Sequence, residues 1–233
     1  MTVFLLGDDE EAFPPAEAAD RSGLLAVGGT LTPRRLVAAY RRGIFPWYAA
    51  GQPILWHSPD PRFVLPFGKL HVPRSLQKTL RRAVFRIRAN HAFEQVVEAC
   101  AETPRPGQEG TWITPEMRGA YIELHRLGIA HSVEAWRDES LVGGLYGVAL
   151  GSVFFGESMF SHAPDASKVV FVRMAEALFA GGCRLIDCQV ETDHLARFGA
   201  EGWSRRRFLR ELGKLLEGPS LAPIFQTLDS QGG

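Results

Sequence analysis

A strand, a helix and a second strand, predicted over residues 150–190, most restrict what this chain can fold into. The segment LGSVFFGESMFSHAPDASKVVFVRMAEALFAGGCRLIDCQV has a strand pattern at each end and an almost wholly apolar helix pattern between them. Pro164 and Asp165 indicate where the helix begins, and Gly181 and Gly182 indicate where it ends. A helix that is apolar nearly all round has to be buried, so the unit predicts a parallel or splayed strand pair within an α/β or α+β domain.

Both strands of this unit carry polar groups where a core strand would be apolar. Side chains alternate between the two faces of a strand, so Phe155, Glu157 and Met159 are expected on one face. The same alternation places Asp187 and Gln189 on one face of the second strand. Ligands favour the carboxyl ends of strands in such sheets, and the pattern therefore predicts a site in which these polar groups face an apolar wall.

Two structural alternatives for these polar groups stay open from the residues alone. An unpaired buried carboxylate would cost several kcal/mol, so Glu157 needs a cation, either from Arg184 or Lys168 or from a ligand. Asp187 and Gln189 can equally form a structural hydrogen-bonded pair.

The rest of the chain predicts a small N-terminal domain and a larger α+β domain. Residues 13–62 are rich in Pro, Gly and aromatic groups, which predicts an irregular unit with Trp47 and Trp56 on loops. We expect domains at residues 1–62 and 63–233, and an α+β (α/β-like) fold class. The expected capping residues, each followed by a helix, are Thr32, Asn90, Thr114 and Ser204. Residues 72–82 predict a further helix, residues 84–88 a strand, and residues 130–137, 141–150 and 152–160 a meander.

Charge is distributed unevenly in a chain whose formal net charge is zero. Residues 61–93 contain eight basic side chains and no acidic one. Arg74, Lys78, Arg81 and Arg82 follow one another at helical spacing and therefore share one helix face. Such a face indicates contact with nucleic-acid phosphates, and a solvated basic flank is the structural alternative.

Other site classes and locations are disfavoured by the sequence. The three cysteines have no C-x-x-C spacing, no segment approaches twenty apolar residues, and the N-terminus does not resemble a signal peptide. These features predict a cytoplasmic protein without a membrane span. Ser158 is followed two residues later by Phe160, where a hydrolase elbow requires glycine, and the histidines lack the spacing of metal ligands.

Several blocks of the sequence together resemble the bacterial leucyl/phenylalanyl-tRNA-protein transferases. In the family's order they are GLLAVGG (23–29), GIFPW (43–47), WHSPDPR (56–62), GTWIT (110–114), GG (143–144), FGESMFS (155–161), ASK (166–168) and LIDCQ (185–189). The resemblance implies an N-acetyltransferase-like C-terminal domain behind a small N-terminal domain. It also implies transfer of Leu or Phe, and less readily Met, from aminoacyl-tRNA to the N-terminal Arg or Lys of a protein, which marks that protein for N-degron degradation.

The expected partners are therefore leucyl-tRNA, phenylalanyl-tRNA and proteins with N-terminal Arg or Lys, with neither DNA nor a membrane. No cofactor or metal is expected. Coenzyme A is not an expected donor, because residues 163–168 read APDASK in place of the acetyltransferases' glycine-rich pyrophosphate loop.

The resemblance also implies roles for individual residues. Asp187 and Gln189 correspond to the catalytic pair, and Glu157 to the residue that meets the acceptor's basic side chain. The residues around the terminal adenosine of the tRNA correspond to Tyr40, Trp47 and Trp112, and those of the amino-acid pocket to Leu145, Met159 and Phe171. The tRNA backbone is expected on the helix face of Arg74, Lys78, Arg81 and Arg82.

A glutamine amide is a very weak base, so we expect Gln189 to orient the acceptor amine while Asp187 fixes the Gln189 amide. The alternative functions are a peptidoglycan-bridge aminoacyltransferase of the same fold and a non-catalytic RNA-binding module.

Overall fold

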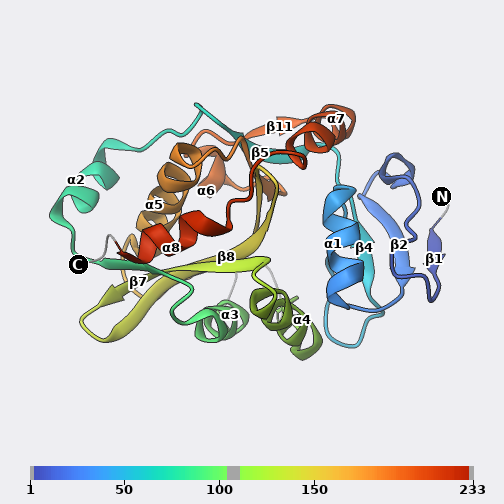
Figure 1. Ribbon diagram of the computed structural model, residues 1–233, viewed down its shortest axis with the longest axis horizontal. Helices are drawn as coiled ribbons and strands as arrows, with labels where there is room; N and C mark the ends of the chain where they lie inside the picture. The colour runs from blue at the N-terminus through green and yellow to red at the C-terminus, as the bar shows by residue number, and fades with distance from the viewer. Residues whose placement is uncertain (1–2, 104–110, 231–233) are drawn as a thin grey trace.

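Two β-sheets of unequal size organise the chain (Figure 1), and the computed structural model describes residues 3–103 and 111–230. The smaller sheet has the strand order β1-β2-β4-β3, and the larger has the order β11-β5-β10-β9-β8-β7-β6. The elements up to the end of the smaller sheet are β1 (Phe4–Leu6), the 3-10 helix η1 (Ala16–Ala18), β2 (Leu24–Gly28), α1 (Pro33–Arg41), β3 (Phe45–Pro46) and β4 (Leu55–His57).

The larger sheet carries helices on both faces, which confirms the α+β class. Its strands are β5 (Arg62–Pro66), β6 (Arg86–Ala89), β7 (Ala130–Arg137), β8 (Ser140–Leu150), β9 (Val153–Ser161), β10 (Leu185–Gln189) and β11 (Glu201–Trp203). Its helices are α2 (Arg74–Arg82), α3 (Phe93–Glu102), α4 (Pro115–Arg126), α5 (Ala166–Ala180), α6 (Asp193–Ala196), α7 (Arg205–Leu215) and α8 (Ala222–Ser230). Helices α5 and α8 cover one face of the sheet, and α3 and α4 cover the other (Figure 1).

Three of the four expected helix caps are confirmed. The side-chain oxygens of Thr32, Thr114 and Ser204 each accept a hydrogen bond from the backbone N–H three residues later, at 3.2–3.3 Å. Each cap satisfies one of the N–H groups that a helix start leaves without an intrahelical partner.

The expected cap at Asn90 is wrong, and α3 begins three residues later, at Phe93. Asn90 lies in the left-handed region, with φ of 59°, and its side-chain oxygen accepts from the Ser132 N–H. The start of α3 is instead held by Glu134 on β7, whose carboxylate accepts from the Ala92 N–H at 3.3 Å. A tertiary contact therefore replaces the local cap.

A β-bulge at Glu157 reverses the alternation of side chains along β9. Tyr146 pairs with Ser158 while Gly147 pairs with Gly156, so Glu157 is an additional residue on this strand. Phe155 belongs to the core on one face of the sheet, whereas Met159 packs against the core on the other face. The expectation that Phe155, Glu157 and Met159 share a face is wrong for Met159, because simple alternation does not include the bulge.

The pair of strands joined by α5 is parallel and then separates, as the sequence predicts. Pairing between β10 and β9 runs from Leu185 opposite Val153 to Asp187 opposite Phe155. Beyond that point β9 continues to Ser161, and β10 ends at Gln189, whose φ of 62° turns the chain away. The separated strand ends leave space between Glu157 and the end of β10.

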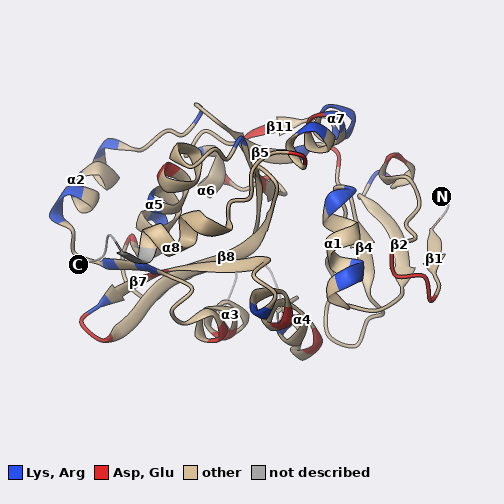
Figure 2. Cartoon of the chain, in the orientation of Figure 1, with Lys and Arg blue, Asp and Glu red and all other residues tan. Residues whose placement is uncertain are grey.

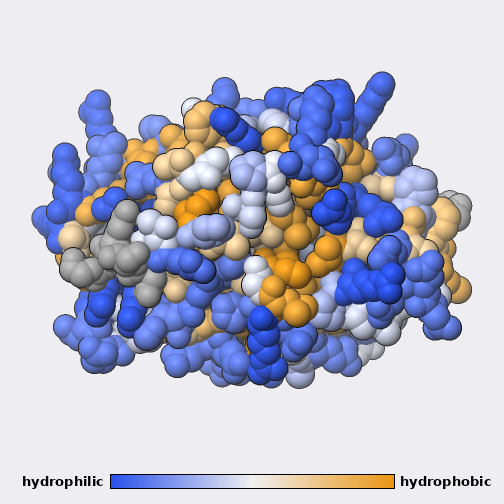
Figure 3. All heavy atoms as spheres, in the orientation of Figure 1, coloured by the Kyte–Doolittle hydropathy of each residue, from blue (hydrophilic) through white to orange (hydrophobic). Residues whose placement is uncertain are grey.

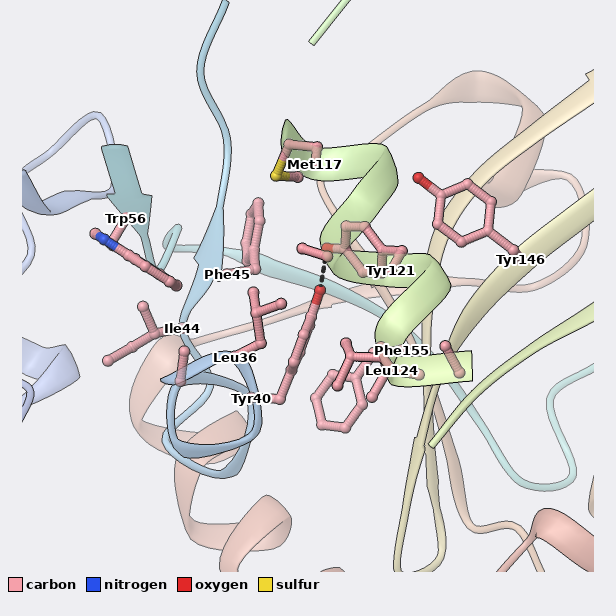
Figure 4. Packing of buried hydrophobic residues seen from close by; sticks show 14 of the residues in the cluster. Leu36, Tyr40, Ile44, Phe45, Trp56, Met117, Tyr121, Leu124, Tyr146 and Phe155 are labelled. Carbon is pink, nitrogen blue, oxygen red and sulfur yellow. Dashed lines mark hydrogen bonds between the residues drawn. The ribbon is translucent and has the colours of Figure 1, made fainter. Parts of the chain in front are cut away.

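One hydrophobic core connects the two sheets. It includes Leu36 and Tyr40 of α1, Tyr121 of α4 and Phe155 of β9 (Figure 4). Trp56 belongs to the same core and lies on β4, fully buried, with its indole N–H donating to the Gly28 carbonyl at 2.9 Å. The expectation of a loop position is therefore wrong for Trp56. The domain boundary after residue 62 stays a prediction.

Candidate active site

A cavity of about 530 Å³ opens where β9 and β10 separate. Its wall combines Phe45, Pro46 and Trp47 from the smaller sheet and the loop after it with residues of β8, β9, α5, β10 and the segment through α6. Apolar side chains also gather on the outer surface near the middle of the face in Figure 3, with hydrophilic side chains around them. The cavity therefore lies at the junction of the two sheets and has a largely apolar wall.

Charge in this cavity is negative or absent. Its acidic side chains are Glu157 and Asp187, and no lysine or arginine of the described residues lines it. His194 also lines it, and burial lowers the pKa of this imidazole, which favours its neutral form at neutral pH. Such a cavity suits an apolar group together with a cation, and it lacks the positive charge that phosphates require.

Asp187 is held by a buried arginine. The Arg62 guanidinium donates to both of its carboxylate oxygens, at 2.8 Å and 2.6 Å, and both side chains are fully buried. The backbone N–H of Gln189 donates to Asp187 Oδ1 at 2.9 Å. Asp187 therefore fixes the backbone of Gln189 and not its side-chain amide, which corrects the expected arrangement of the pair.

The Arg62 side chain is enclosed by residues that come before it in the sequence and by residues that come after it. Its guanidinium carbon lies 4.7 Å from the ring centroids of Phe45 and Phe208, and Nη1 donates to the Gly43 carbonyl at 3.2 Å. Stacking between two aromatic rings and a bidentate carboxylate are the contacts for which a planar guanidinium is suited. Arg62 is one of the eight basic side chains of residues 61–93, but because it is buried it does not contribute to a basic surface.

Glu157 accepts three hydrogen bonds from neutral groups. Tyr40 Oη and Gln189 Nε2 donate to Oε1, each at 2.8 Å, and Tyr121 Oη donates to Oε2 at 2.7 Å. This network joins α1, α4, β9 and the end of β10, and it holds the Gln189 amide that Asp187 does not hold.

The structural alternative of an ion pair for Glu157 is wrong. Lys168 pairs with Asp165 at 2.7 Å, and the Arg184 guanidinium lies over the Phe67 ring at 4.8 Å. No described cation replaces them at Glu157. A ligand can therefore supply the missing positive charge.

The geometry around Glu157 favours its protonated form when no cation is bound. The hydroxyl oxygens of Tyr40 and Tyr121 lie 2.5 Å apart (Figure 4), and each also contacts the carboxylate. When Glu157 is ionised, both hydroxyls donate to it and no proton is left for the contact between the two tyrosines. When Glu157 is protonated and donates to one tyrosine, all three oxygen–oxygen contacts can be hydrogen bonds. Burial raises the pKa of Glu157 to about 7, against the lowering effect of its hydrogen-bond donors.

The predicted amino-acid pocket residues lie together on the cavity wall. Leu145 and Met159 are cross-strand partners on β8 and β9, Phe171 comes from α5, and all three line the cavity. Met174 and Ile186 complete this wall and were missed by the sequence analysis. The spacing of Met174, three residues after Phe171 on one helix, was the signal that could have identified it.

Two of the three predicted adenosine residues line the cavity. Trp47, which is 36% exposed, and Trp112 belong to its wall. Tyr40 is fully buried and does not line the cavity, and it reaches the site through its hydrogen bond to Glu157. Tyr121 was missed, although its position four residues after the buried Met117 on a predicted helix indicated an inward-facing hydroxyl.

The predicted basic face is on α2, at the end of the molecule opposite the smaller sheet (Figures 1 and 2). All four of its basic residues, Arg74, Lys78, Arg81 and Arg82, are exposed, and none lines the cavity. The structure therefore separates this face from the other predicted site residues.

The sequence matches known proteins over most of its length. The sequence profile described as leucyl/phenylalanyl-tRNA protein transferase matches residues 64–213, and the profile of that enzyme's N-terminal domain matches residues 29–60. The chain belongs to the leucyl/phenylalanyl-tRNA-protein transferase family. The resemblance drawn from the sequence blocks is confirmed.

Relatives named leucyl/phenylalanyl-tRNA-protein transferase share more than half of their residues with this chain. The relative from Myxococcus xanthus (strain DK1622) is 62% identical over 221 residues, which cover 94% of each chain. The relative from Anaeromyxobacter sp. (strain K) is 61% identical over 226 residues, or 97% of each chain. A solved GCN5-related N-acetyltransferase from Kribbella flavida has a TM-score of 0.36 and 13% identity, over 72% of this chain and 60% of that chain.

Among residues 3–103 and 111–230, no helix is both long and apolar enough to cross a membrane.

Proposed function

We propose that this transferase moves Leu or Phe, and less readily Met, from aminoacyl-tRNA to the α-amino group of a protein that begins with Arg or Lys. The observation that carries the proposal is a buried carboxylate, Glu157, without a described cation beside it in a cavity whose wall is largely apolar. The product is a protein marked for N-degron degradation, and the reaction takes place in the cytoplasm, where aminoacyl-tRNA is made.

The donor occupies the apolar side of the cavity in this proposal. Leu145, Met159 and Phe171 contact the Leu or Phe side chain, and Trp47 and Trp112 contact the terminal adenosine. Tyr40 supports the site through Glu157. The phosphates of the tRNA lie outside the cavity, on the basic face of α2. The division of the chain into residues 1–62 and 63–233 is part of the same proposal.

The acceptor's basic side chain binds Glu157. A carboxylate has about four lone-pair positions, and the three donors leave one of them, on Oε2, for an N–H of Arg or Lys. A cation within hydrogen-bond distance of the carboxylate favours its ionised form, so binding of the acceptor releases the proton of Glu157.

Aminolysis needs little more than positioning, because the aminoacyl ester is already activated. An α-amino group with a pKa near 8 is about one-tenth unprotonated at neutral pH. The neutral amine nitrogen attacks the ester carbonyl and a tetrahedral intermediate forms. The carbon–oxygen bond to the ribose then breaks, and the ribose oxygen takes up the proton that the amine nitrogen loses. Gln189 orients the amine through its side-chain oxygen, because Glu157 holds its amide and Asp187 holds its backbone.

The test is single-turnover transfer of labelled Leu from tRNA to peptides that differ only in their first residue, Arg or Ala. Wild type should transfer to the Arg peptide with the higher kcat/KM. In the Glu157→Gln variant, which keeps the shape and removes the charge, kcat/KM for the Arg peptide should fall by the equivalent of about 2 to 4 kcal/mol and change little for the Ala peptide. Equal losses for both peptides would show that Glu157 has only a structural role.

A further inference from the structure

The proposed donor brings negative charge to a cavity that has no cation to receive it. A phosphodiester adjoins the terminal adenosine of any tRNA, whereas no described lysine or arginine lines the cavity. The exposed basic face of α2 lies at the far end of the molecule (Figure 2). An RNA strand that runs from the α2 face to the cavity therefore needs positively charged side chains of the protein between these two places.

A second pocket, of about 150 Å³, adjoins the cavity at His194, which lines both. It lies between the start of α2, the start of α5 and α6, and its lining includes Pro73, Ser75, Asp165, Lys168, His194 and Arg197. Arg74, the first basic residue of the α2 face, stands between two of these lining residues in the chain and is exposed. The pocket thus connects the basic face with the cavity.

The charge of this pocket matches a single phosphodiester. Lys168 and Arg197 are positive and Asp165 is negative, which leaves one net positive charge. Asp165 is already engaged, because Oδ1 accepts from Lys168 at 2.7 Å and Oδ2 accepts from Thr79 at 3.3 Å. Arg197 forms no ion pair with any described residue and is exposed. Its guanidinium is therefore available to an anion.

His194 adds a polar atom without a partner to the wall between the two pockets. Its Nε2 is buried and makes no hydrogen bond among the described residues. A buried polar atom without a partner costs free energy, and an oxygen of a bound phosphate or ribose can satisfy it.

We infer that this pocket is a subsite for a phosphodiester of the donor's 3'-terminal nucleotides, bound by Arg197 and Lys168 on the path from the α2 face to the cavity. The inference rests on the proposed donor, aminoacyl-tRNA. It assigns to Arg197 and Lys168 a contact with the RNA backbone that is independent of the nucleotide sequence.

The test compares donors that differ only in the number of phosphates they contain. Leucyl-adenosine has none, leucyl-CpA has one, leucyl-CpCpA has two, and intact leucyl-tRNA follows. In wild type, KM should fall by about three- to tenfold when the first or the second phosphate is added, and in Arg197→Ala this fall should be lost. The variant should keep the wild-type KM and kcat for leucyl-adenosine. For phosphate-containing donors, the slope of log KM against log salt should decrease by about 0.7.

Arg173→Ala is the matched control, because Arg173 also lies outside the cavity, on α5, and is already paired with Glu176. It makes the same change in net charge and should leave the donor series unchanged. Lys168→Gln should show the same dependence on phosphate as Arg197→Ala. An equal rise in KM for leucyl-adenosine and leucyl-CpCpA, or no rise for any donor, would overturn the subsite.

A binding measurement keeps the subsite testable if transfer itself fails. Uncharged CpCpA should bind wild type more tightly than adenosine does, measured by tryptophan fluorescence with Trp47 and Trp112 at the cavity. Arg197→Ala should abolish that difference, and Arg173→Ala should not. Wild type that shows this difference but transfers no Leu would refute the proposed function and retain the subsite, whereas equal binding of CpCpA and adenosine would refute the subsite.

Discussion

Gln189 is held at two points by two different carboxylates. Its backbone N–H donates to Asp187, and its side-chain amide donates to Glu157. The left-handed backbone at Gln189, uncommon for a residue other than glycine, depends on this support. The proposed role of Gln189 in orienting the acceptor amine therefore depends on both acids.

Gln189→Glu should lower transfer, although glutamate is the stronger base. The new carboxylate would lie against Glu157, at the position where an amide now donates at 2.8 Å, and two like charges disfavour each other. We expect kcat to fall at least about tenfold at pH 7. Single-turnover rates with saturating donor would measure the effect. A rate equal to or above that of wild type would show that proton removal limits the reaction.

The stability of the protein should depend on pH through Glu157. Its pKa rises from 4.5 to about 7 on folding, so the folded state holds a proton that the unfolded state releases between these values. The free energy of unfolding should therefore fall by about 3 kcal/mol as pH rises from 4.5 to 7. In Glu157→Gln this contribution should vanish.

Urea unfolding of wild type and Glu157→Gln between pH 4.5 and 8 would check this expectation. Burial lowers the pKa of His131 to about 4, which changes stability in the opposite direction, but equally in both proteins. The difference between the two stability curves therefore reports on Glu157 alone. Parallel curves would contradict the shifted pKa.

At the scale of elements, the sequence predicted what depends on neighbours along the chain. Thr32, Thr114 and Ser204 cap helices because a cap needs only a side-chain oxygen and an N–H three residues away. The bulge at Glu157 was not predictable in this way, because it is defined by pairing with β8. Asn90 failed as a cap for the same reason, since β7 supplies its partner.

In the candidate site, too, some residues were predictable from the sequence, and residues that depend on distant contacts were not. Leu145 and Phe171 were predicted as pocket residues from the family resemblance, and both line the cavity. The partner of Asp187 was not, because Arg62 lies 125 residues away and is one of eight basic residues in an acid-free block. Only burial distinguishes it from the others.

The basic face of α2 should contribute to tRNA binding as a unit. Replacing Arg74, Lys78, Arg81 and Arg82 with Ala should weaken binding of any tRNA by at least about tenfold, and should lower the slope of log K against log salt by about three to four. Filter binding at several salt concentrations would measure both quantities.

Helix α7 provides a control with the same change in charge. Its exposed basic residues are Arg206, Arg207, Arg210 and Lys214, and three of them already form ion pairs with Glu201 or Glu211. Replacing these four with Ala should change tRNA binding far less. Equal losses for the two helices would mean that net charge, and not the α2 face, determines the affinity.

At the scale of the whole molecule, one buried side chain connects the parts that form the cavity. Arg62 opens β5 of the larger sheet, binds Asp187 on β10, stacks on Phe208 of α7, and donates to Gly43 beside the smaller sheet. Of the parts that Arg62 contacts, β10 and the β3 segment with Phe45 also line the cavity. Loss of this contact should therefore affect stability and the site together.

Arg62→Ala should destabilise the protein by about 3 to 5 kcal/mol, because it leaves the fully buried Asp187 carboxylate without its cation. Arg126→Ala, which breaks exposed ion pairs with Glu94 on α3 and Glu123 on α4, should cost less than about 1 kcal/mol. Equilibrium unfolding in urea would compare the two variants. Similar small losses would show that water or another group replaces the guanidinium at Asp187.

The position of Arg62 also limits how this chain can be recombined with a relative. The residue stands at the expected boundary between the two domains, yet its surroundings come from both sides, with Phe45 before it and Phe208 after it. In a chimera joined at residue 62, the Phe45 ring would come from one protein and the Phe208 ring from the other. The two proteins must therefore place these rings compatibly around Arg62, so the smaller sheet and α7 have to be exchanged together although they are far apart in the sequence.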